Sequence, residues 1–203
     1  MDITFRPPEK HDYKTVADII CETWKFDRFG SKQTVDKISM IYLADCLCNQ
    51  NYTEVAVADG NVVGIIMAKK ADCKHIPVRF SLMRIKYILQ MIFAPEAKSL
   101  KGLYKKFGSA DDELMKTVKT KFDAEISLFA VSKKSKRMGI GGILYSRLME
   151  DFKNSGTKSF FLCTDSDCDY GFYDHKGLKC IAEKTFSVNQ CHYTDFTFYI
   201  YSN

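Results

Sequence analysis

Val131-Ser132-Lys133-Lys134-Ser135-Lys136-Arg137-Met138-Gly139-Ile140-Gly141-Gly142 joins a basic run to closely spaced glycines. Apolar residues 126–131 lead into it and predict a buried strand, while residues 140–154 have the spacing of an amphipathic helix. Glycines let a backbone approach a ligand closely, and the first turn of a helix offers N–H donors and a partial positive charge. The stretch therefore predicts a pyrophosphate site, with lysines and Arg137 to neutralise the phosphates. We expect position 141 to require glycine, because a side chain there would occupy the space of the phosphate.

Composition and charge restrict the class of protein. The 203 residues fit one globular domain, which we expect to span 1–203, and 46% hydrophobic residues are ample for a core. A net charge of +5 suits an anionic ligand but is weaker than a dedicated nucleic-acid binder carries. No apolar run reaches the length of a membrane span, and the first residues lack a signal-peptide pattern. We therefore expect a cytoplasmic protein with no membrane partner.

The eight cysteines predict buried thiols rather than disulfides or a metal site. No two are spaced as Cys-x-x-Cys: Cys46 and Cys48 are two apart, and His192 only adjoins Cys191. Reduced cysteines are usual in a cytosolic chain. We therefore expect no metal.

The remaining patterns predict an α/β (mixed α+β) order. Asp59-Gly60 between two β-rich runs is a strong hairpin signal, and Gly64 predicts a bulge or a close backbone approach. Gly156 and Gly177 predict the ends of two helices. The expected strands cover 3–6, 52–58, 62–68, 123–131, 158–164, 178–186 and 192–201, and the expected helices cover 11–24, 34–48, 140–154 and 170–176.

Residues 69–121 differ in character from the rest of the chain. They are rich in lysine and arginine and carry an apolar stripe that predicts one or two helices. The stripe comprises Phe80, Met83, Tyr87, Ile88, Met91 and Ile92. It either packs on the body, with the lysines in solvent, or forms a lid or substrate-recognition insert with an oligomer surface. The two interpretations are compatible, because a lid must also pack.

Two common phosphate loops do not fit. Gly139-Ile140-Gly141-Gly142 lacks the Lys-Ser/Thr pair of a P-loop. A dinucleotide fingerprint has its first glycine close after the first strand of a βαβ unit and an acidic residue about 20 positions further on. Here a long basic loop separates the strand from the glycines, and the strand comes late in the chain.

The segment Lys136-Arg137-Met138-Gly139-Ile140-Gly141 resembles the acetyl-CoA loop of the GCN5-related N-acetyltransferase (GNAT) family. The family pattern is Gln/Arg-x-x-Gly-x-Gly/Ala. Lys136 stands where Arg or Gln is usual, so charge is kept while the fork geometry is not. Because the loop binds mainly through backbone N–H groups, we expect binding to survive this difference.

Gly171-Phe172-Tyr173-Asp174-His175-Lys176-Gly177-Leu178 is similar to a second family segment, aromatic-Tyr-Glu-Lys-x-Gly-Phe. Asp174 replaces Glu and Leu178 replaces Phe. Ala124-Glu125-Ile126 is spaced from the loop as in members that carry a strand glutamate. The resemblance covers 1–68 loosely and 122–201 well, and it leaves the segment between them unexplained.

The resemblance implies a single GNAT-like domain whose central, mostly antiparallel, twisted sheet is flanked by helices, with 69–121 as a helical insert between the third and fourth strands. It implies direct transfer of an acetyl group from acetyl-CoA, a co-substrate, to a primary amine of a small molecule or peptide. Tyr173 would be the general acid for the departing thiolate, and Glu125 the base, directly or through a water. The implied cofactor-binding residues are Phe129, Ala130, Val131, Lys136, Arg137, Met138, Gly139, Ile140, Gly141, Gly142 and Ser166.

Each of these assignments has an alternative. Tyr173 could be a core tyrosine, Glu125 a strand-edge carboxylate, and the lysines a solvated run. The alternative function is a non-catalytic acyl-CoA-binding sensor module, and a nucleophilic Cys163 or Cys168 is a weaker one. We expect acetyl-CoA and an unidentified amine acceptor as partners, no nucleic-acid partner, and a monomer or a homodimer.

Overall fold

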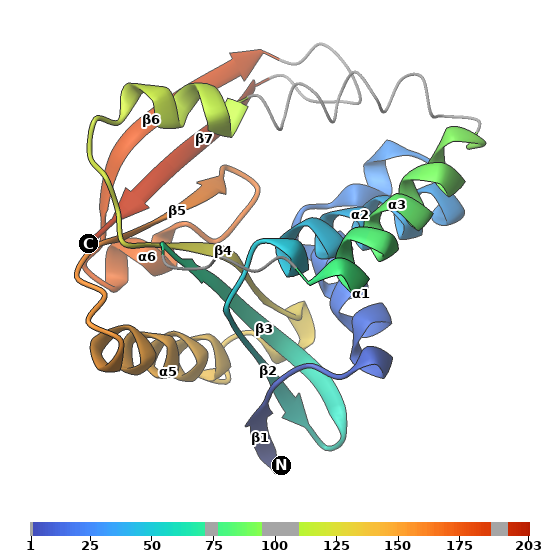
Figure 1. The fold of residues 1–203 in the computed structure, drawn as a ribbon, viewed down its shortest axis with the longest axis horizontal. Helices are drawn as coiled ribbons and strands as arrows, with labels where there is room; N and C mark the ends of the chain where they lie inside the picture. Colours follow the sequence, from blue (N-terminus) through green and yellow to red (C-terminus); the bar gives the residue numbers. More distant parts are fainter. Residues whose placement is uncertain (1, 72–76, 95–109, 188–194) are drawn as a thin grey trace.

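The computed structural model describes residues 2–71, 77–94, 110–187 and 195–203. They form a seven-stranded sheet with helices on both faces (Figure 1). The strands are β1 (Ile3–Arg6), β2 (Tyr52–Ala58), β3 (Asn61–Lys70), β4 (Ala124–Val131), β5 (Phe160–Asp165), β6 (Lys179–Ser187) and β7 (Asp195–Ser202). The helices are α1 (Tyr13–Thr23), α2 (Lys32–Cys48), α3 (Val78–Ile92), a helix over 110–117, α5 (Ile140–Asn154) and α6 (Gly171–His175), with short 3-10 turns at Lys10–Asp12, Phe26–Phe29 and Lys133–Ser135.

The sheet has the strand order β1-β2-β3-β4-β5-β7-β6. Its neighbouring strands are antiparallel except β4 and β5, which run parallel. The chain passes from β4 to β5 through α5, because a parallel pair needs a long crossover connection. The mixed α/β class and the mostly antiparallel sheet flanked by helices are confirmed.

The β2–β3 hairpin turns at Asp59-Gly60, as the sequence predicts. Both residues have positive φ angles, 47° and 79°, which is the backbone of a type I′ turn. The pairing register shifts just after the turn and leaves Val63 without a partner on β2. A Cβ atom on Gly64 would lie only 3.2 Å from Leu144 Cδ1 on α5. Both features predicted for Gly64, the bulge and the close approach, are therefore present.

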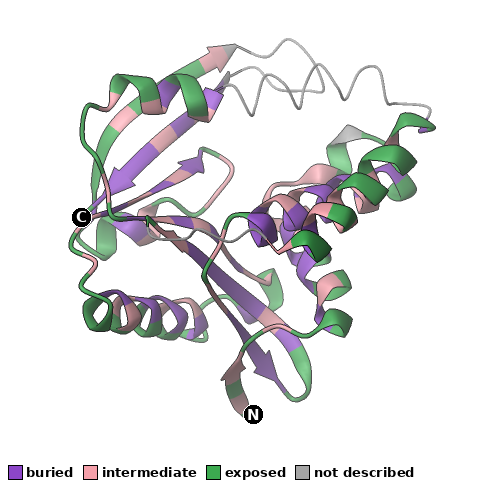
Figure 2. Ribbon diagram, viewed as in Figure 1, coloured by how far each residue is buried: buried purple, intermediate pink, exposed green. Residues whose placement is uncertain are grey.

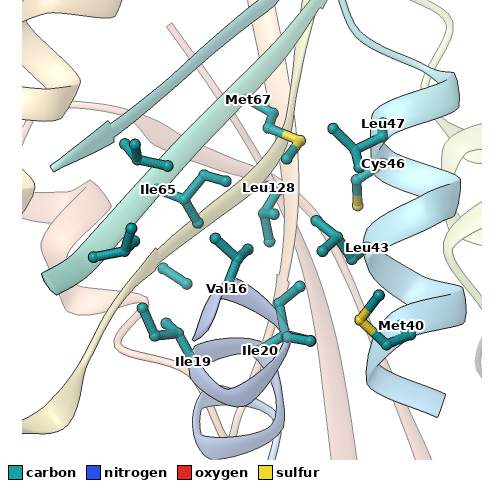
Figure 3. Packing of buried hydrophobic residues seen from close by; sticks show 14 of the residues in the cluster. Val16, Ile19, Ile20, Met40, Leu43, Cys46, Leu47, Ile65, Met67 and Leu128 are labelled. Carbon is teal, nitrogen blue, oxygen red and sulfur yellow. The ribbon is translucent and has the colours of Figure 1, made fainter. Parts of the chain in front are cut away.

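Hydrophobic cores lie on both faces of the sheet. The core under α1 and α2 includes Val16, Ile20, Leu43, Leu47, Ile65, Met67 and Leu128 (Figure 3). The core under α5 and α6 includes Ile66, Ala68, Ile126, Leu144, Leu148, Leu162 and Tyr173. The helix over 110–117 packs through Ala110 and Leu114 on β7. The central strands are buried on both faces, which explains why their sequences are continuous apolar runs rather than alternating ones.

The insert between β3 and β4 begins and ends at paired residues. Lys70 on β3 pairs with Ala124 on β4, and the N–H of Ala71 donates to the carbonyl of Asp123 at 2.7 Å. Within the insert, α3 and the helix over 110–117 are described, so the expectation of one or two helices is confirmed there. Residues 72–76 and 95–109 lie outside the described part of the chain.

Only part of the apolar stripe on α3 packs against the body. Phe80 is buried, and Met83 and Tyr87 lie against the core of α1 and α2. Ile88 and Ile92 are 42% and 62% exposed. They lie roughly 100–140° around the helix from Tyr87, because each residue advances an α-helix by about 100°. The interpretation that the whole stripe packs inward is therefore wrong.

The predicted boundaries hold closely elsewhere. The helix at 140–154 is α5 at both ends, and Gly156 and Gly177 follow their helices with φ angles of 73° and 78°. β5 begins two residues later than expected, because the Asp123 carboxylate accepts the N–H groups of Lys158 and Ser159 at 2.9 Å each. Among the helices described here, none is long and apolar enough to cross a membrane.

Candidate active site

β4 and β5 part from each other after a short parallel pairing. They pair at only three positions, the last of which joins Ile126 to Leu162. β4 then continues to Val131 alongside β3. Beyond Ile126, the edge of β4 that faces β5 has no strand partner within the described residues. Phe129, Ala130 and Val131, which the resemblance implies as cofactor-binding residues, lie on this part of β4.

A β-bulge coincides with the point of parting. Met67 pairs with Leu128 and Ala68 pairs with Ile126, so Ser127 is the extra residue of β4. The bulge changes which residues face each core: Ile126 belongs to the core under α5, and Leu128 to the core under α1 and α2. Bulges of this kind are common beside active sites, because they redirect the side chains that follow.

The basic loop after β4 is held by contacts to neighbouring elements. The N–H of Ser132 donates to the carbonyl of Val63 at 2.9 Å, and the N–H of Lys133 donates to the carboxylate of Glu22 on α1 at 2.9 Å. Ser135 is buried although it lies between lysines. The backbone of the loop is therefore fixed, while the side chains of Lys134 and its charged neighbours reach solvent.

The loop joins α5 at a glycine with a left-handed backbone conformation. Gly139 is the residue before the helix, with φ 76°, and Arg137 also has a positive φ of 66°. The first N–H bond across the turn runs from Ile143 to the Gly139 carbonyl at 3.1 Å. Within the described residues, no backbone acceptor or side-chain cap meets the N–H groups of residues 140–142. These donors and the helix dipole fit a phosphate group.

Three cations surround this helix terminus. Lys136 Nζ lies 3.6 Å from an Asp169 carboxylate oxygen, and Arg137 is exposed beside it. Lys176 is the third, because its Nζ lies 4.0 Å from where a Gly142 Cβ would be. The Lys176 ammonium also lies 5.4 Å from the ring centres of both Tyr145 and Phe172. Sequence reasoning included Lys176 in the second family segment but gave it no role.

The predicted reason for glycine at 141 is wrong. A Cβ on Gly141 would contact Phe129, Val131 and Phe172 at 3.5–3.9 Å, which is ordinary van der Waals distance. The missing side chain therefore points toward the hydrophobic packing between β4 and α6 and not toward phosphate space. Ile140 is also a core residue, with 1% exposure, so only its backbone is available to a ligand.

Tyr173 is buried in the core under α5 and α6, with 8% exposure. Its ring lies 5.6 Å from the rings of both Phe172 and Tyr201. Burial, followed by the nearby Cys168 and Asp165, raises the pKa of the Tyr173 phenol well above its ordinary value. The phenol is therefore protonated at neutral pH.

Glu125 lies on the other face of the sheet. Its neighbours Ala124 and Ile126 both belong to the core under α5, and side chains alternate along a strand. Burial raises the pKa of the Glu125 carboxyl, partly offset by Lys69 on the paired strand. Glu125 and Tyr173 thus lie on opposite faces of the sheet, and Glu125 is one residue before the last position at which β4 and β5 pair.

Sequence reasoning missed two further buried carboxyl groups, of which Asp111 lies near both Glu125 and Asp165. Asp111, in the helix over 110–117, has its pKa raised to about 7 by burial and by the charges of Asp165 and Glu125. Asp165 ends β5, and burial raises its pKa although its carboxylate accepts the N–H of Asp167 at 2.9 Å. In the described part of the chain, no group of three His, Cys, Asp or Glu side chains is arranged to hold a metal ion.

Other residues that the sequence singled out have structural roles. Ser166 Oγ accepts the N–H of Thr197 at 3.2 Å, which extends the pairing of β5 with β7. His175 Nδ1 lies 2.6 Å from the Gly171 carbonyl one turn earlier. Burial raises the pKa values of Cys163 and Cys168, so both are thiols rather than nucleophilic thiolates. The described cysteines are free, whereas Cys73, Cys191 and His192 lie outside the described residues.

Solved structures share this fold at low sequence identity. A protein from Desulfovibrio desulfuricans described as a GNAT-family acetyltransferase has 14% identity and a TM-score of 0.55, with 100% of this chain and 98% of that one covered. PaiA N-acetyltransferase from Thermoplasma acidophilum, in complex with coenzyme A, has 15% identity and a TM-score of 0.53, with 100% and 99% covered. NAA60 from Arabidopsis thaliana, in complex with a bisubstrate analogue, has 12% identity and a TM-score of 0.55, with 100% and 97% covered.

Comparison with curated protein sequences finds no match. The acetyltransferase (GNAT) family profile matches residues 16–177, from α1 to the end of α6. That range contains the parted strands, the basic loop, the donor-rich start of α5 and the α6 tyrosine. On this match, which spans most of its length, the chain belongs to the GNAT acetyltransferase family.

Proposed function

We propose that this protein transfers an acetyl group from acetyl-CoA directly to a primary amine of a small molecule or peptide. The observation that carries the proposal is the parting of β4 and β5, with Tyr173 on one face of the sheet and Glu125 on the other. Acetyl-CoA supplies the acetyl group as a reactive thioester. Two substrates that meet where the strands part, one from each face of the sheet, would need no covalent enzyme intermediate, because their juxtaposition itself contributes much of the rate.

The donor side of the site is the face that carries α5. N–H groups of residues 140–142 and the charges of Lys136, Arg137 and Lys176 would bind the pyrophosphate. The unpaired edge of β4 at residues 129–131 offers backbone groups to the pantetheine arm and a donor to the thioester oxygen. Met138 and Ser166 would be peripheral, the first through its exposed side chain and the second through its hydroxyl proton.

Tyr173 would act as the general acid. Its buried phenol is protonated at neutral pH, so it has a proton to give to the departing thiolate. Packing against the rings of Phe172 and Tyr201 holds the Tyr173 ring in place. This group can therefore donate a proton but cannot serve as a base.

Glu125 would act as the base on the opposite face, directly or through a water. Its raised pKa strengthens it as a proton acceptor. Asp111 is a second carboxyl group near Glu125, and a cationic acceptor such as a protonated amine would favour the ionised form of both groups. The amine would lose its proton to Glu125, and the sulfur of coenzyme A would gain a proton from Tyr173, so that the protons of the transfer balance.

Tyr173→Phe tests the proposal. Acetyl-CoA, a panel of primary amines and a thiol reagent report amine-dependent release of coenzyme A. The variant should lose about 10²–10⁴-fold in kcat while its Kd for acetyl-CoA stays within about twofold. Tyr201→Phe is the matched control, since it removes a hydroxyl from the same aromatic stack and should retain turnover. Undiminished turnover in Tyr173→Phe would remove this residue from the mechanism.

The competing function is an acyl-CoA-binding sensor without turnover. Both functions need the loop and α5, so affinity for acetyl-CoA does not separate them. The sensor predicts tight binding of acetyl-CoA with no amine-dependent thiol release for any amine in the panel. The placement of Glu125 across the sheet from Tyr173 favours the enzyme, because a sensor needs no group on the acceptor face.

A further inference from the structure

α3 has a second apolar face that is largely exposed in the described structure. Phe80, Met83 and Tyr87 form the inner face against the core. The outer face of α3 consists of Val78, Leu82, Ile85, Ile88, Leu89, Ile92 and the following Phe93, which are 68%, 61%, 49%, 42%, 54%, 62% and 86% exposed. These are seven of the eleven large hydrophobic residues that are exposed in the described chain. Figure 2 shows α3 largely exposed at the rim of the molecule.

The outer face is a straight and continuous ridge. Residues 78, 82, 85, 89 and 92 follow alternating steps of four and three, which places them in one line along the helix. At about 1.5 Å per residue the line is about 21 Å long. A soluble protein rarely exposes an apolar strip of this length without a partner.

The charges that border the ridge all have one sign. α3 carries Arg79, Arg84 and Lys86 and no acidic residue. Arg84 is on the inner side, where it binds Asp45 at 2.7 Å. Arg79 and Lys86 are seven residues apart, so they lie two turns apart on the same flank of the ridge, and both are exposed. The partner must therefore offer an apolar surface and negative charge together.

A second copy of this chain does not meet that requirement. Two α3 helices that packed through their outer faces would bring Arg79 and Lys86 of one copy toward the same cations of the other, and the helix offers no carboxylate to pair with them. An interfacial helix in an anionic bilayer has the pattern observed: an apolar face, flanking cations with long stems, and no acidic residue.

We propose that the outer face of α3 binds the surface of an anionic lipid bilayer. The helix lies parallel to the membrane, with its ridge at the boundary of headgroups and acyl chains and with Arg79 and Lys86 at lipid phosphates. This proposal departs from the expectation of no membrane partner, which was based on the lack of a spanning segment, because α3 would lie on the bilayer rather than across it.

The test is sedimentation of the full chain with large unilamellar vesicles, either of phosphatidylcholine alone or with about 30% phosphatidylserine. Binding to the mixed vesicles should be at least tenfold stronger. The double variant Leu82→Glu/Leu89→Glu should bind the mixed vesicles at least tenfold more weakly. Ile181→Glu on β6 is the matched control, since it changes an exposed hydrophobic residue elsewhere and should bind as wild type does.

Three results would overturn the proposal. The first is no binding to the mixed vesicles at low salt. The second is equal binding by Leu82→Glu/Leu89→Glu and wild type, which would reduce the effect to the net positive charge of the chain. The third is a dimer in analytical ultracentrifugation that Leu82→Glu/Leu89→Glu abolishes, which would assign the ridge to a second copy. Circular dichroism and the Kd for acetyl-CoA confirm that each variant is folded.

Discussion

A glycine with a left-handed backbone lies at each end of α5. Comparing the same substitution at the two ends separates an effect on ligand binding from an effect on stability. Gly139 precedes the helix with φ 76°, and Gly156 follows it with φ 73°. At both positions a Cβ atom would meet nothing within 4 Å. Replacement by alanine therefore costs backbone strain and causes no collision, at either end of the same helix.

The expected loss of stability follows from that conformation. A left-handed backbone costs an L-residue about 1–2 kcal/mol, and alanine recovers about 0.4–1 kcal/mol by restricting the unfolded chain. Gly139→Ala and Gly156→Ala should each lower the free energy of unfolding by about 1 kcal/mol. For a chain of this size that change lowers Tm by about 2–4 °C. Urea and thermal unfolding, followed by circular dichroism, measure both.

Binding should separate the two variants. Gly139 aims the free N–H groups at the start of α5, whereas Gly156 lies at the far end. Gly139→Ala should weaken the binding of acetyl-CoA about tenfold in calorimetric titration. A loss of this size is close to the lower end of the free energy of one hydrogen bond to a charged group, about 1.5–3 kcal/mol. Gly156→Ala should leave the Kd within about twofold. Equal weakening by both variants would refute the assignment of the donors to the start of α5.

Gly141→Ala, in the same loop, should change the free energy of unfolding in the opposite direction. Residue 141 is helical, and its Cβ would make contacts at 3.5–3.9 Å. Replacement should raise the free energy of unfolding by about 0.5–1 kcal/mol, because glycine is a poor helix former. If Gly141→Ala is as destabilising as Gly139→Ala, the strain argument is wrong.

Three further predictions concern the surrounding groups. The contribution of Asp111 to stability should fall as pH rises from about 4 to about 7, because the folded state holds a proton on Asp111, whose pKa is raised from 3.8 to about 7, and Asp111→Asn should stabilise the protein more at pH 8 than at pH 5 in urea unfolding. Arg147→Met should cost about 2 kcal/mol by the same method, since the buried Glu54 would lose two hydrogen bonds of 2.7 Å and keep only the Tyr52 hydroxyl; restored stability in Arg147→Met/Glu54→Gln is the control. Cys168→Ala should retain turnover within about threefold, and an acetylated cysteine in the mass spectrum would contradict direct transfer.

Local signals predicted the parts of the site that lie close together in the sequence. The basic loop, the exact span of α5 and the glycines at its ends follow from spacing and turn chemistry. The parting of β4 and β5 has no sequence signal, because no local pattern reports where a strand loses its neighbour. The bulge at Ser127 that accompanies the parting has no sequence signal of its own.

Groups that meet across long separations were the ones missed. Asp111 comes to Glu125 and Asp165 through the packing of Ala110 and Leu114 on β7, which a helical period does not specify. For α3, the period predicted a helix but not which of its two apolar faces is buried. Both faces have the same spacing, and contact with α2 decides between them.

The junction of the insert has a consequence for how proteins of this kind can diversify. Since Lys70 and Ala124 are paired neighbours, the chain between them leaves and returns at one point of the sheet. The entropy of closing such an excursion changes by only about 0.6 kcal/mol for each doubling of its length. Segments of very different size could therefore be exchanged at this point with little loss of stability. Such an exchange would replace Asp111 and the ridge of α3 together and leave α5 with its loop unchanged. The groups proposed to face the acceptor and the membrane would then change in one step, while the proposed cofactor loop stayed the same.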